Sequence, residues 1–123
     1  MEKSSKSQTV VPYLVLPDAS KFLVFAIKVF GASESFKAMR DENTIQHAEL
    51  KIGESTIMFA DTTGEFPVQP AALTVYVASV DETFNKAVKA GATVVMKLSD
   101  QQYGRIGGVK DPFGNTWWLM TAK

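Results

Sequence analysis

The amino-acid sequence predicts an α+β protein made of two βαβββ modules, and three observations support this fold class. An apolar β-prone run followed by an amphipathic helix occurs twice, about 60 residues apart. Three further β-prone segments follow each helix, and a segment with two prolines at 62–71 separates the two series. A repeat at this spacing indicates duplicated supersecondary units. The periodicity also fits a ferredoxin-like βαββαβ arrangement, which would leave two strands unassigned.

The first module begins with an expected strand over residues 9–16, which stops before a helix. Asp18 is the expected N-cap of this helix, and Gly31 stands where a left-handed C-cap residue belongs. An apolar stripe at helical spacing is formed by Phe22, Phe25, Ala26, Val29 and Phe30. A tight turn at 53–54 separates the last two of three further strands, expected at about 34–40, 45–52 and 55–61.

The second module repeats this design from a strand expected over residues 73–80. Asp81 is the expected N-cap and Gly91 the expected end of the helix, whose apolar stripe is Phe84, Ala87 and Val88. The last three strands are expected at 93–98, 104–110 and 115–120. A type I turn at 111–114, in which Asp leads, Pro follows and Gly closes, joins the final pair.

Composition excludes several classes of protein. The sequence is 46% hydrophobic and 21% charged, which is typical of a soluble globular domain. Its net charge is zero and its basic residues are scattered, so nucleic acid or an anionic membrane is not expected as a partner. The absence of cysteine excludes disulfides, thiolate zinc sites and Cys nucleophiles. No leader or spanning segment is evident, and a cytoplasmic location is expected by elimination.

The expected organisation is a tail followed by one domain. The tail covers residues 1–8 and the domain 9–123, with module one at about 9–61, the linker at 62–71 and module two at about 72–121.

Two stretches resemble motifs of a known superfamily. "HAELKIGESTIMFAD" (47–61) and "YGRIGGVKDPFGNTWWL" (103–119) resemble the vicinal oxygen chelate superfamily, which includes glyoxalase I, bleomycin-resistance proteins and extradiol dioxygenases. The resemblance is closest to its PhnB-like, glyoxalase-related branch and covers residues 9–121. It implies a curved eight-stranded sheet forming half-barrel cups, with helices on the convex side and the ligand on the concave side. The glycine pair at 107–108 would then allow close strand packing or a bulge.

The resemblance also implies where a metal site would lie. Metal-dependent relatives bind a divalent ion through a His or similar ligand on the first strand of each half and a Glu on the last. The corresponding positions fall at about Val11, Val75 and Trp118, and near residues 59–61, where only Asp61 can coordinate. Valine and indole offer a metal no donor atom. We therefore expect the family metal site to be lost and no cofactor to be bound.

Polar residues on the third strand suggest a site of another kind. His47 and Glu49 share one strand face, whereas Ala48, Leu50 and Ile52 occupy the other and are expected to pack on the helix. A His–Glu pair can bind a polar ligand or move a proton, which makes both residues candidate catalytic groups. The alternative is a lone histidine on a partly solvated strand.

An apolar lining with a few polar groups is expected around this pair. Trp118 is predicted to point inward as a stacking wall, with Trp117 packed under a helix; alternatively, Trp118 only fills the volume of a lost metal site. Arg105 is expected either to bind a carboxylate or phosphate of the ligand or to pair with a surface carboxylate. The remaining expected lining residues are Val11, Met58, Val75, Val77 and Tyr103.

These expectations lead to three functions. The first is a small-molecule-binding protein that lacks the family metal site. The second is a metal-dependent lyase, isomerase or dioxygenase of the same superfamily that uses His47 and Glu49. The third is a dimeric interaction module with a filled pocket. A homodimer is expected in each case, because relatives commonly dimerise and unpaired strand edges favour pairing.

Overall fold

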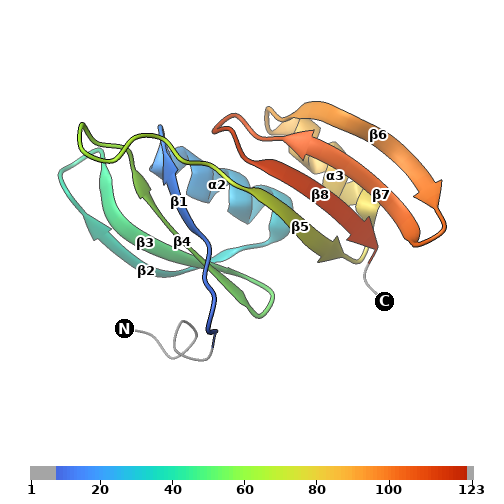
Figure 1. Ribbon diagram of the computed structural model, residues 1–123, viewed down its shortest axis with the longest axis horizontal. Helices are drawn as coiled ribbons and strands as arrows, with labels where there is room; N and C mark the ends of the chain where they lie inside the picture. The colour runs from blue at the N-terminus through green and yellow to red at the C-terminus, as the bar shows by residue number, and fades with distance from the viewer. Residues whose placement is uncertain (1–7, 122–123) are drawn as a thin grey trace. The chain divides into compact units, whose positions relative to one another are not determined.

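The computed structural model describes residues 8–121 of the chain, and this part contains eight strands and two helices. The chain divides between Pro70 and Ala71 into two units, each of which is a βαβββ module (Figure 1). The predicted duplication is therefore confirmed. The eight strands are hydrogen-bonded as two four-stranded sheets, one in each unit.

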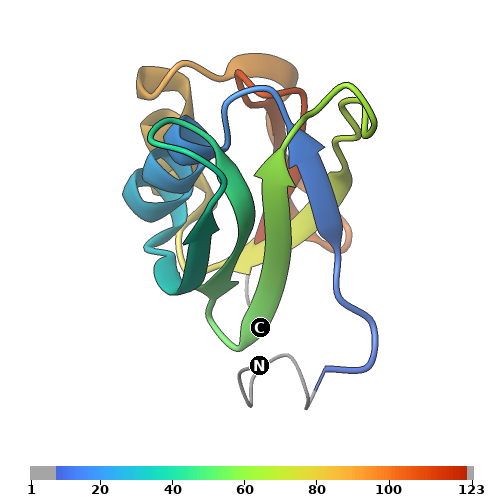
Figure 2. The ribbon, with the colours of Figure 1, turned by 90° about the vertical axis from the view of Figure 1, so that its left-hand side faces the viewer.

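The first unit contains one helix and four strands. In chain order they are β1 (Tyr13–Leu16), α2 (Ala19–Phe30), β2 (Ser33–Met39), β3 (Ile45–Ile52) and β4 (Ser55–Asp61). The strand order is β1-β4-β3-β2, in which β1 runs parallel to β4 and the other neighbours are antiparallel (Figure 2).

One face of this sheet packs against α2. Phe22 of the helix and Phe59 of β4 are both fully buried, and their rings meet edge to face with centroids 5.1 Å apart. Ala48 and Leu50 of β3 are also fully buried, as the alternation of the strand predicted. Because side chains alternate along a strand, the residues between these point to the opposite face, which α2 does not cover and which we call the open face of the first unit.

The ends of α2 are stabilised in different ways. Gly31 adopts a left-handed conformation with φ of 68°, as predicted, and its N–H bonds the last turn of the helix. Asp18 occupies the N-cap position, but among the described residues its side chain makes no capping hydrogen bond. Asp61 of β4 supplies the acceptor at this end of the helix, because its Oδ1 accepts from the N–H of Ala19 at 2.9 Å. Its Oδ2 accepts from the N–H of Ile45, the first residue of β3, at 2.6 Å.

The first strand is shorter than predicted, because it begins at Tyr13 rather than at residue 9. The side-chain amide of Gln8 bonds to both the N–H and the C=O of Thr56, so residue 8 of the predicted tail is held against β4. The rest of that tail lies outside the described residues. In the predicted linker, Gln69 forms an antiparallel bridge with Val15 and so covers the outer edge of β1.

The second unit repeats the topology. Its elements are β5 (Ala72–Val77), α3 (Val80–Lys89), β6 (Thr93–Gln101), β7 (Gly104–Lys110) and β8 (Thr116–Thr121). The strand order is β5-β8-β7-β6, with β5 parallel to β8. Neither helix in the described part of the chain has the length and apolar character needed to cross a membrane.

The helix of this unit begins two residues earlier than predicted. Ser79, not Asp81, is the N-cap, and its Oγ accepts from the N–H of Glu82 at 3.2 Å. Asp81 lies in the first turn, where an acidic side chain interacts favourably with the helix dipole. At the other end the helix stops at Lys89, and Gly91 follows with φ of 108°.

The final hairpin is organised by one buried carboxylate. The predicted turn is present, since the N–H of Gly114 bonds to the C=O of Asp111 at 3.2 Å. The Asp111 carboxylate accepts four further hydrogen bonds, from the N–H of Phe113, from the N–H and side-chain amide of Asn115, and from Nε1 of Trp117. These bonds link the turn to a tryptophan that is fully buried, as predicted.

The glycine pair in β7 admits one ring on each face of the sheet. A Cβ at Gly107 would lie 2.9 Å from Cδ2 of Phe84, which belongs to α3. A Cβ at Gly108 would lie 2.5 Å from Cζ3 of Trp118, on the face that α3 does not cover. The glycines thus make room for rings rather than for closer strands, and the irregular register of β6 opposite Gly108 corresponds to the predicted bulge. We call the Trp118 side the open face of the second unit.

Candidate functional site

The strand registers bring a row of four residues together on the open face of the first unit. Across the sheet, Tyr13 of β1 pairs with Met58 of β4, Met58 with Glu49 of β3, and Glu49 with Phe36 of β2. Directly paired residues point to the same side of a sheet, so these four side chains share the open face. His47 precedes Glu49 by two positions and therefore lies on the same face.

Three of these residues are connected by hydrogen bonds. The phenol oxygen of Tyr13 lies 3.1 Å from Nδ1 of His47, and Nε2 of His47 lies 3.2 Å from Oε2 of Glu49. The Tyr13 and His47 rings are stacked with centroids 5.6 Å apart, and the Phe36 ring lies 5.8 Å from the imidazole on a second side. The structure therefore brings the predicted His–Glu pair together and adds a tyrosine to it.

The partners determine how protons are distributed along this series. Burial raises the pKa of the Tyr13 phenol above 10.0, so its hydroxyl is protonated at neutral pH. With that hydroxyl donating to Nδ1, a neutral imidazole carries its proton on Nε2 and donates it to Oε2 of Glu49. The histidine thus holds the glutamate carboxylate in one orientation.

Glu49 is the most unusual residue of the group. Its side chain is completely buried, yet its Oε1 atom has no hydrogen-bond partner in the described part of the chain. The Oγ1 of Thr56, also fully buried, lacks a partner in the same sense. Thr56 lies on the open face beside the row, two positions before Met58. A buried polar atom left unpaired costs about 1–3 kcal/mol, and more when it is charged. Oε1 of Glu49 therefore marks a place where a donor is missing, and the Thr56 hydroxyl a place where either a donor or an acceptor is missing.

Most of the predicted site residues of the first unit lie on or near this face. His47, Glu49 and Met58 are within it, whereas Val11 precedes β1 and is half-buried. Tyr13 was not predicted as a site residue. Alternation along the first strand already placed Tyr13 on the same face as Val11, and this was the available signal.

Asp61, the one predicted position on β4 able to coordinate a metal, is a structural residue. It pairs with Leu16 in register and lies on the α2 side of the sheet. Both of its carboxylate oxygens accept backbone N–H groups, as described above, so it does not contribute to the open face.

Two of the predicted lining residues of the second unit lie on the wrong face. Thr74 pairs with Trp118, and Val75 pairs with Leu119. Val75 and, by alternation, Val77 therefore point to the side of the sheet covered by α3, not to the Trp118 side as predicted. The error arose because the register between parallel strands is set by tertiary pairing and is not visible in either strand alone.

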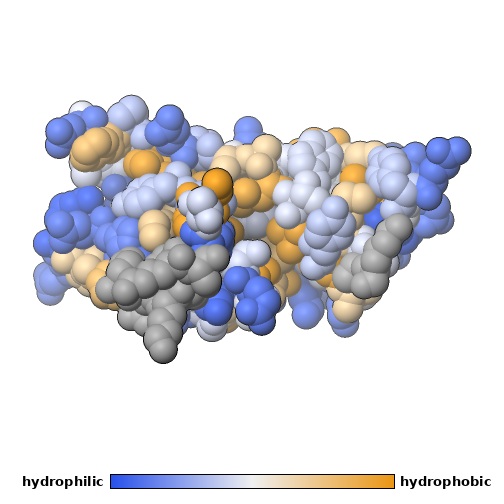
Figure 3. All heavy atoms as spheres, turned by 60° about the horizontal axis from the view of Figure 1, so that its bottom comes forward, coloured by the Kyte–Doolittle hydropathy of each residue, from blue (hydrophilic) through white to orange (hydrophobic). Residues whose placement is uncertain are grey.

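The open face of the second unit carries Trp118 together with Tyr76, Met96 and Met120. Trp118 is half-buried, and Tyr76 is 65% exposed. Figure 3 shows apolar side chains mixed with pale, weakly polar ones over this unit. Whether Trp118 contacts a ligand remains a prediction.

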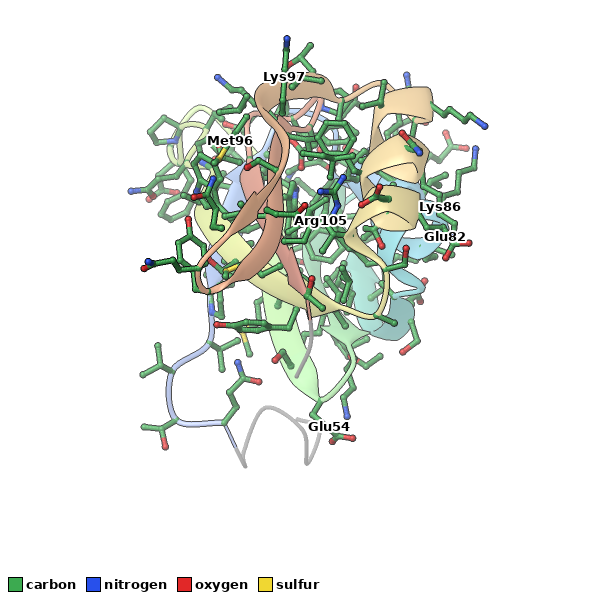
Figure 4. The ribbon with its side chains drawn as sticks, turned by 90° about the vertical axis from the view of Figure 1, so that its right-hand side faces the viewer. Glu54, Glu82, Lys86, Met96, Lys97 and Arg105 are labelled. Atoms are coloured by element: carbon green, nitrogen blue, oxygen red, sulfur yellow. The ribbon has the colours of Figure 1, made fainter. Side chains whose placement is uncertain are left out.

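Arg105 pairs with two carboxylates of its own unit. Figure 4 shows it on the α3 side of the sheet, opposite Met96. Its guanidinium donates to both carboxylate oxygens of Asp81, at 2.5 and 3.2 Å, and to Asp100 at 3.1 Å. Of the two predicted roles, pairing with surface carboxylates is the one observed. Tyr103 lies at the tip of the β6–β7 hairpin and is 54% exposed.

The residues at the family metal positions do not fit a divalent cation. On the open faces, the strands expected to supply ligands present Tyr13 and Val15 (β1), Met58 and Ala60 (β4), Thr74 and Tyr76 (β5), and Thr116, Trp118 and Met120 (β8). None is His, Cys, Asp or Glu, the side chains from which such sites are normally built. Among the described residues no three such side chains cluster as a ligand set.

Comparison with known proteins identifies relatives in sequence and in structure. The sequence model of the Glyoxalase/Bleomycin resistance protein/Dioxygenase superfamily matches residues 9–119. The uncharacterized protein Mb0911c of Mycobacterium bovis is 36% identical over 120 residues, covering 88% of this chain and 79% of that protein.

Two solved structures illustrate the shared fold. TioX from Micromonospora sp. ML1 superposes with a TM-score of 0.75 at 27% identity, covering 91% of this chain and 96% of TioX. The PhnB protein from Bacillus cereus gives a TM-score of 0.72 at 21% identity, covering 94% and 100% of the two chains. At 21% identity, the second comparison shows the fold alone.

Proposed function

Since the chain belongs to the glyoxalase/bleomycin resistance protein/dioxygenase superfamily, we propose that it is a small-molecule-binding protein whose ligand lies on the open face of the first unit. One observation carries this proposal. A fully buried glutamate, Glu49, is held by His47 and keeps one carboxylate oxygen without a partner in the described part of the chain.

The surroundings of Glu49 support binding of a compact ligand. Met58 and the rings of Tyr13 and Phe36 supply apolar surface in the same row, and both rings are partly exposed, at 48% and 38%. Apolar walls around a few fixed polar atoms are typical of small-molecule sites. A ligand group that donates to Oε1 would remove the cost of the unpaired atom, and this gain would contribute to affinity.

The proposal includes two further properties. The protein binds its ligand without the family metal, because the family positions carry none of the His, Cys, Asp or Glu side chains from which such sites are normally built. It also works in the cytoplasm, which cell fractionation tests directly.

A ligand screen by thermal shift, followed by calorimetry, tests the proposal. A ligand that binds only the folded protein raises its melting temperature by mass action. Glu49→Gln keeps the shape of the side chain but replaces an acceptor oxygen, so ligands of this face should lose affinity. Glu54→Gln is the matched control, because Glu54 is exposed in the β3–β4 turn of the same unit (Figure 4). Equal affinity of the two variants for every ligand found would refute the proposed site.

Catalysis by proton transfer is a second candidate function, and the linked series Tyr13–His47–Glu49 favours it. Oε1 of Glu49 is placed to accept a proton from a bound substrate, while His47 orients the carboxylate through its other oxygen. Exchange of α-protons of small ketones and aldehydes in D₂O, followed by NMR, is the test. Exchange that disappears in Glu49→Gln and persists in Glu54→Gln supports an isomerase or lyase; binding without exchange supports a receptor.

We also propose that the protein is a homodimer. Within residues 8–121, no strand pairs with the outer edge of β2 or of β6. Such edges favour pairing with a second chain. A molar mass of 13.5 kDa by light scattering, which is that of a single chain, would contradict this part of the proposal.

A further inference from the structure

We infer that the ligand of the open face is an organic cation with a planar N–H fork, an amidinium or guanidinium, joined to a flat apolar body. The inference rests on the proposed function and specifies its ligand class. It follows from one juxtaposition: two buried oxygens without partners, Glu49 Oε1 and Thr56 Oγ1, lie on one sheet face beside exposed aromatic rings.

The charge of Glu49 calls for a cation. The one group in the described chain that bonds to its carboxylate is Nε2 of His47, which reaches Oε2 and leaves Oε1 unpaired. Lys51 lies two positions further along the same face, but it forms no ion pair within residues 8–121. Burying a carboxylate is costly unless a cation pairs with it, so a ligand cation is stabilised here and an anion is repelled.

The Thr56 hydroxyl, next to Glu49 on the same face, can act as the acceptor for a second donor of the ligand. In the antiparallel pairing of β3 and β4, Glu49 faces Met58 and Thr56 is its diagonal neighbour. Diagonal neighbours have Cα atoms about 7–8 Å apart, and the side chains between them converge further. An amidinium presents two N–H groups in a fixed fork, which can donate to Oε1 and Oγ1 together. A primary ammonium lacks this planar arrangement.

The rings of Tyr13 and Phe36 favour a ligand with a flat apolar body. Across the strand order β1-β4-β3-β2, Tyr13 and Phe36 stand at the two ends of the row, with Met58 and Glu49 between them. Neighbouring strands lie about 4.8 Å apart, so the backbone of Tyr13 is about 10 Å from that of Glu49. The His47 ring lies between their side chains and bonds to both. A benzene ring attached to the charged fork spans this distance over Met58. Aromatic faces near a cation add electrostatic attraction.

Three probes that differ only in the charged group test the inference. Benzamidine, benzamide and benzoate share a ring and a planar fork, but they are cationic, neutral and anionic. By calorimetry, benzamidine is expected to bind at least tenfold more tightly than benzamide, and benzoate is not expected to bind. Glu49→Gln should remove this preference. Thr56→Val should lower the affinity for benzamidine but not that for benzamide, and Glu54→Gln should leave all three affinities unchanged.

NMR of the unaltered protein gives a readout that does not depend on the folding of a variant. Benzamidine should shift the amide signals of residues on β1, β3 and β4, centred on Glu49 and Thr56. Shifts centred elsewhere, or equal affinity for benzamidine and benzamide, would overturn the inference. If benzamide, benzoate or another neutral or anionic compound binds at Glu49 and benzamidine does not, the proposed function stands and the inference fails. If no compound of the wider screen binds, both fail.

Discussion

Substitution of Gly108 by alanine should destabilise the protein through contact with one ring. The added Cβ would lie 2.5 and 2.7 Å from two carbons of the Trp118 indole and 3.3 Å from the Cβ of Met96. Carbon atoms in contact normally stand about 3.5–4.0 Å apart, so the ring must move outward by about 1 Å. Gly108 does not have a positive φ, so its backbone accepts alanine without strain.

Two opposing terms determine the size of the effect. Inserting a methyl group into a packed site costs about 1–3 kcal/mol. Replacing glycine by alanine at a compatible backbone position stabilises by about 0.4–1 kcal/mol, because the unfolded chain loses freedom. The net expectation is a loss of about 1–2 kcal/mol in the free energy of unfolding. Trp118 is half-buried, so its ring can move toward solvent, and this movement limits the loss in the free energy of unfolding.

Urea unfolding of five proteins measures this effect: the parent, Gly108→Ala, Gly64→Ala, Trp118→Leu and the double variant at 108 and 118. Gly64→Ala is the control, because no atom lies within 4 Å of its added Cβ and its φ is not positive; it should be neutral or slightly stabilising. In a Trp118→Leu background the ring is absent, so Gly108→Ala should cost much less than in the parent protein. If Gly108→Ala is as stable as Gly64→Ala, or if its cost is unchanged in the Trp118→Leu background, the indole contact does not explain the glycine.

Three other outcomes are expected. Asp61→Ala removes two charge-assisted hydrogen bonds to backbone N–H groups, so the free energy of unfolding measured with urea should fall by about 3 kcal/mol. Asp18→Ala is the control, because it removes no such bond in the described chain; its loss should be under half of that. Because burial raises the Tyr13 pKa, the folded state retains this proton longer than the unfolded chain; stability should fall as pH rises above 10.0, and less so in Tyr13→Phe. Untagged protein should contain far less than one divalent metal per chain, and EDTA should leave its melting temperature unchanged; stoichiometric, tightly held metal would contradict the proposed metal-free site.

The fold was predictable because its signals are local. Alternation placed Ala48 and Leu50 on the helix side of β3, and both are fully buried. The hairpin turn at 111–114 and the left-handed Gly31 follow from residue types that few other conformations favour. The N-cap prediction at the second helix was wrong although a local signal was present: Ser79 is followed three positions later by Glu82, the spacing of a capping box, which Asp81 lacks.

The candidate site was predictable only in part. The pairing of His47 with Glu49 follows from their spacing on one strand, which alternation reveals. The contribution of Tyr13 depends on the register between β1 and β4, and the error at Val75 and Val77 depends on that between β5 and β8. The sequence allowed Arg105 either a ligand anion or a surface carboxylate as its partner. The position of α3 places Asp81 within hydrogen-bond distance of the guanidinium.

The sequence by itself determined the duplicated module, the tight turn between the last two strands of each module, and the face on which the His–Glu pair lies. These features depend on dihedral preferences and on the period of side chains, which act between residues close in the chain. The tertiary structure alone decided which buried side-chain oxygens of residues 8–121 remain without partners: Oγ1 of Thr44, Oε1 of Glu49 and Oγ1 of Thr56 do, whereas both carboxylate oxygens of Asp61 are used. The physical reason is that a hydrogen bond forms or fails within a few tenths of an ångström. Positions of that accuracy arise only when strands distant in sequence have paired.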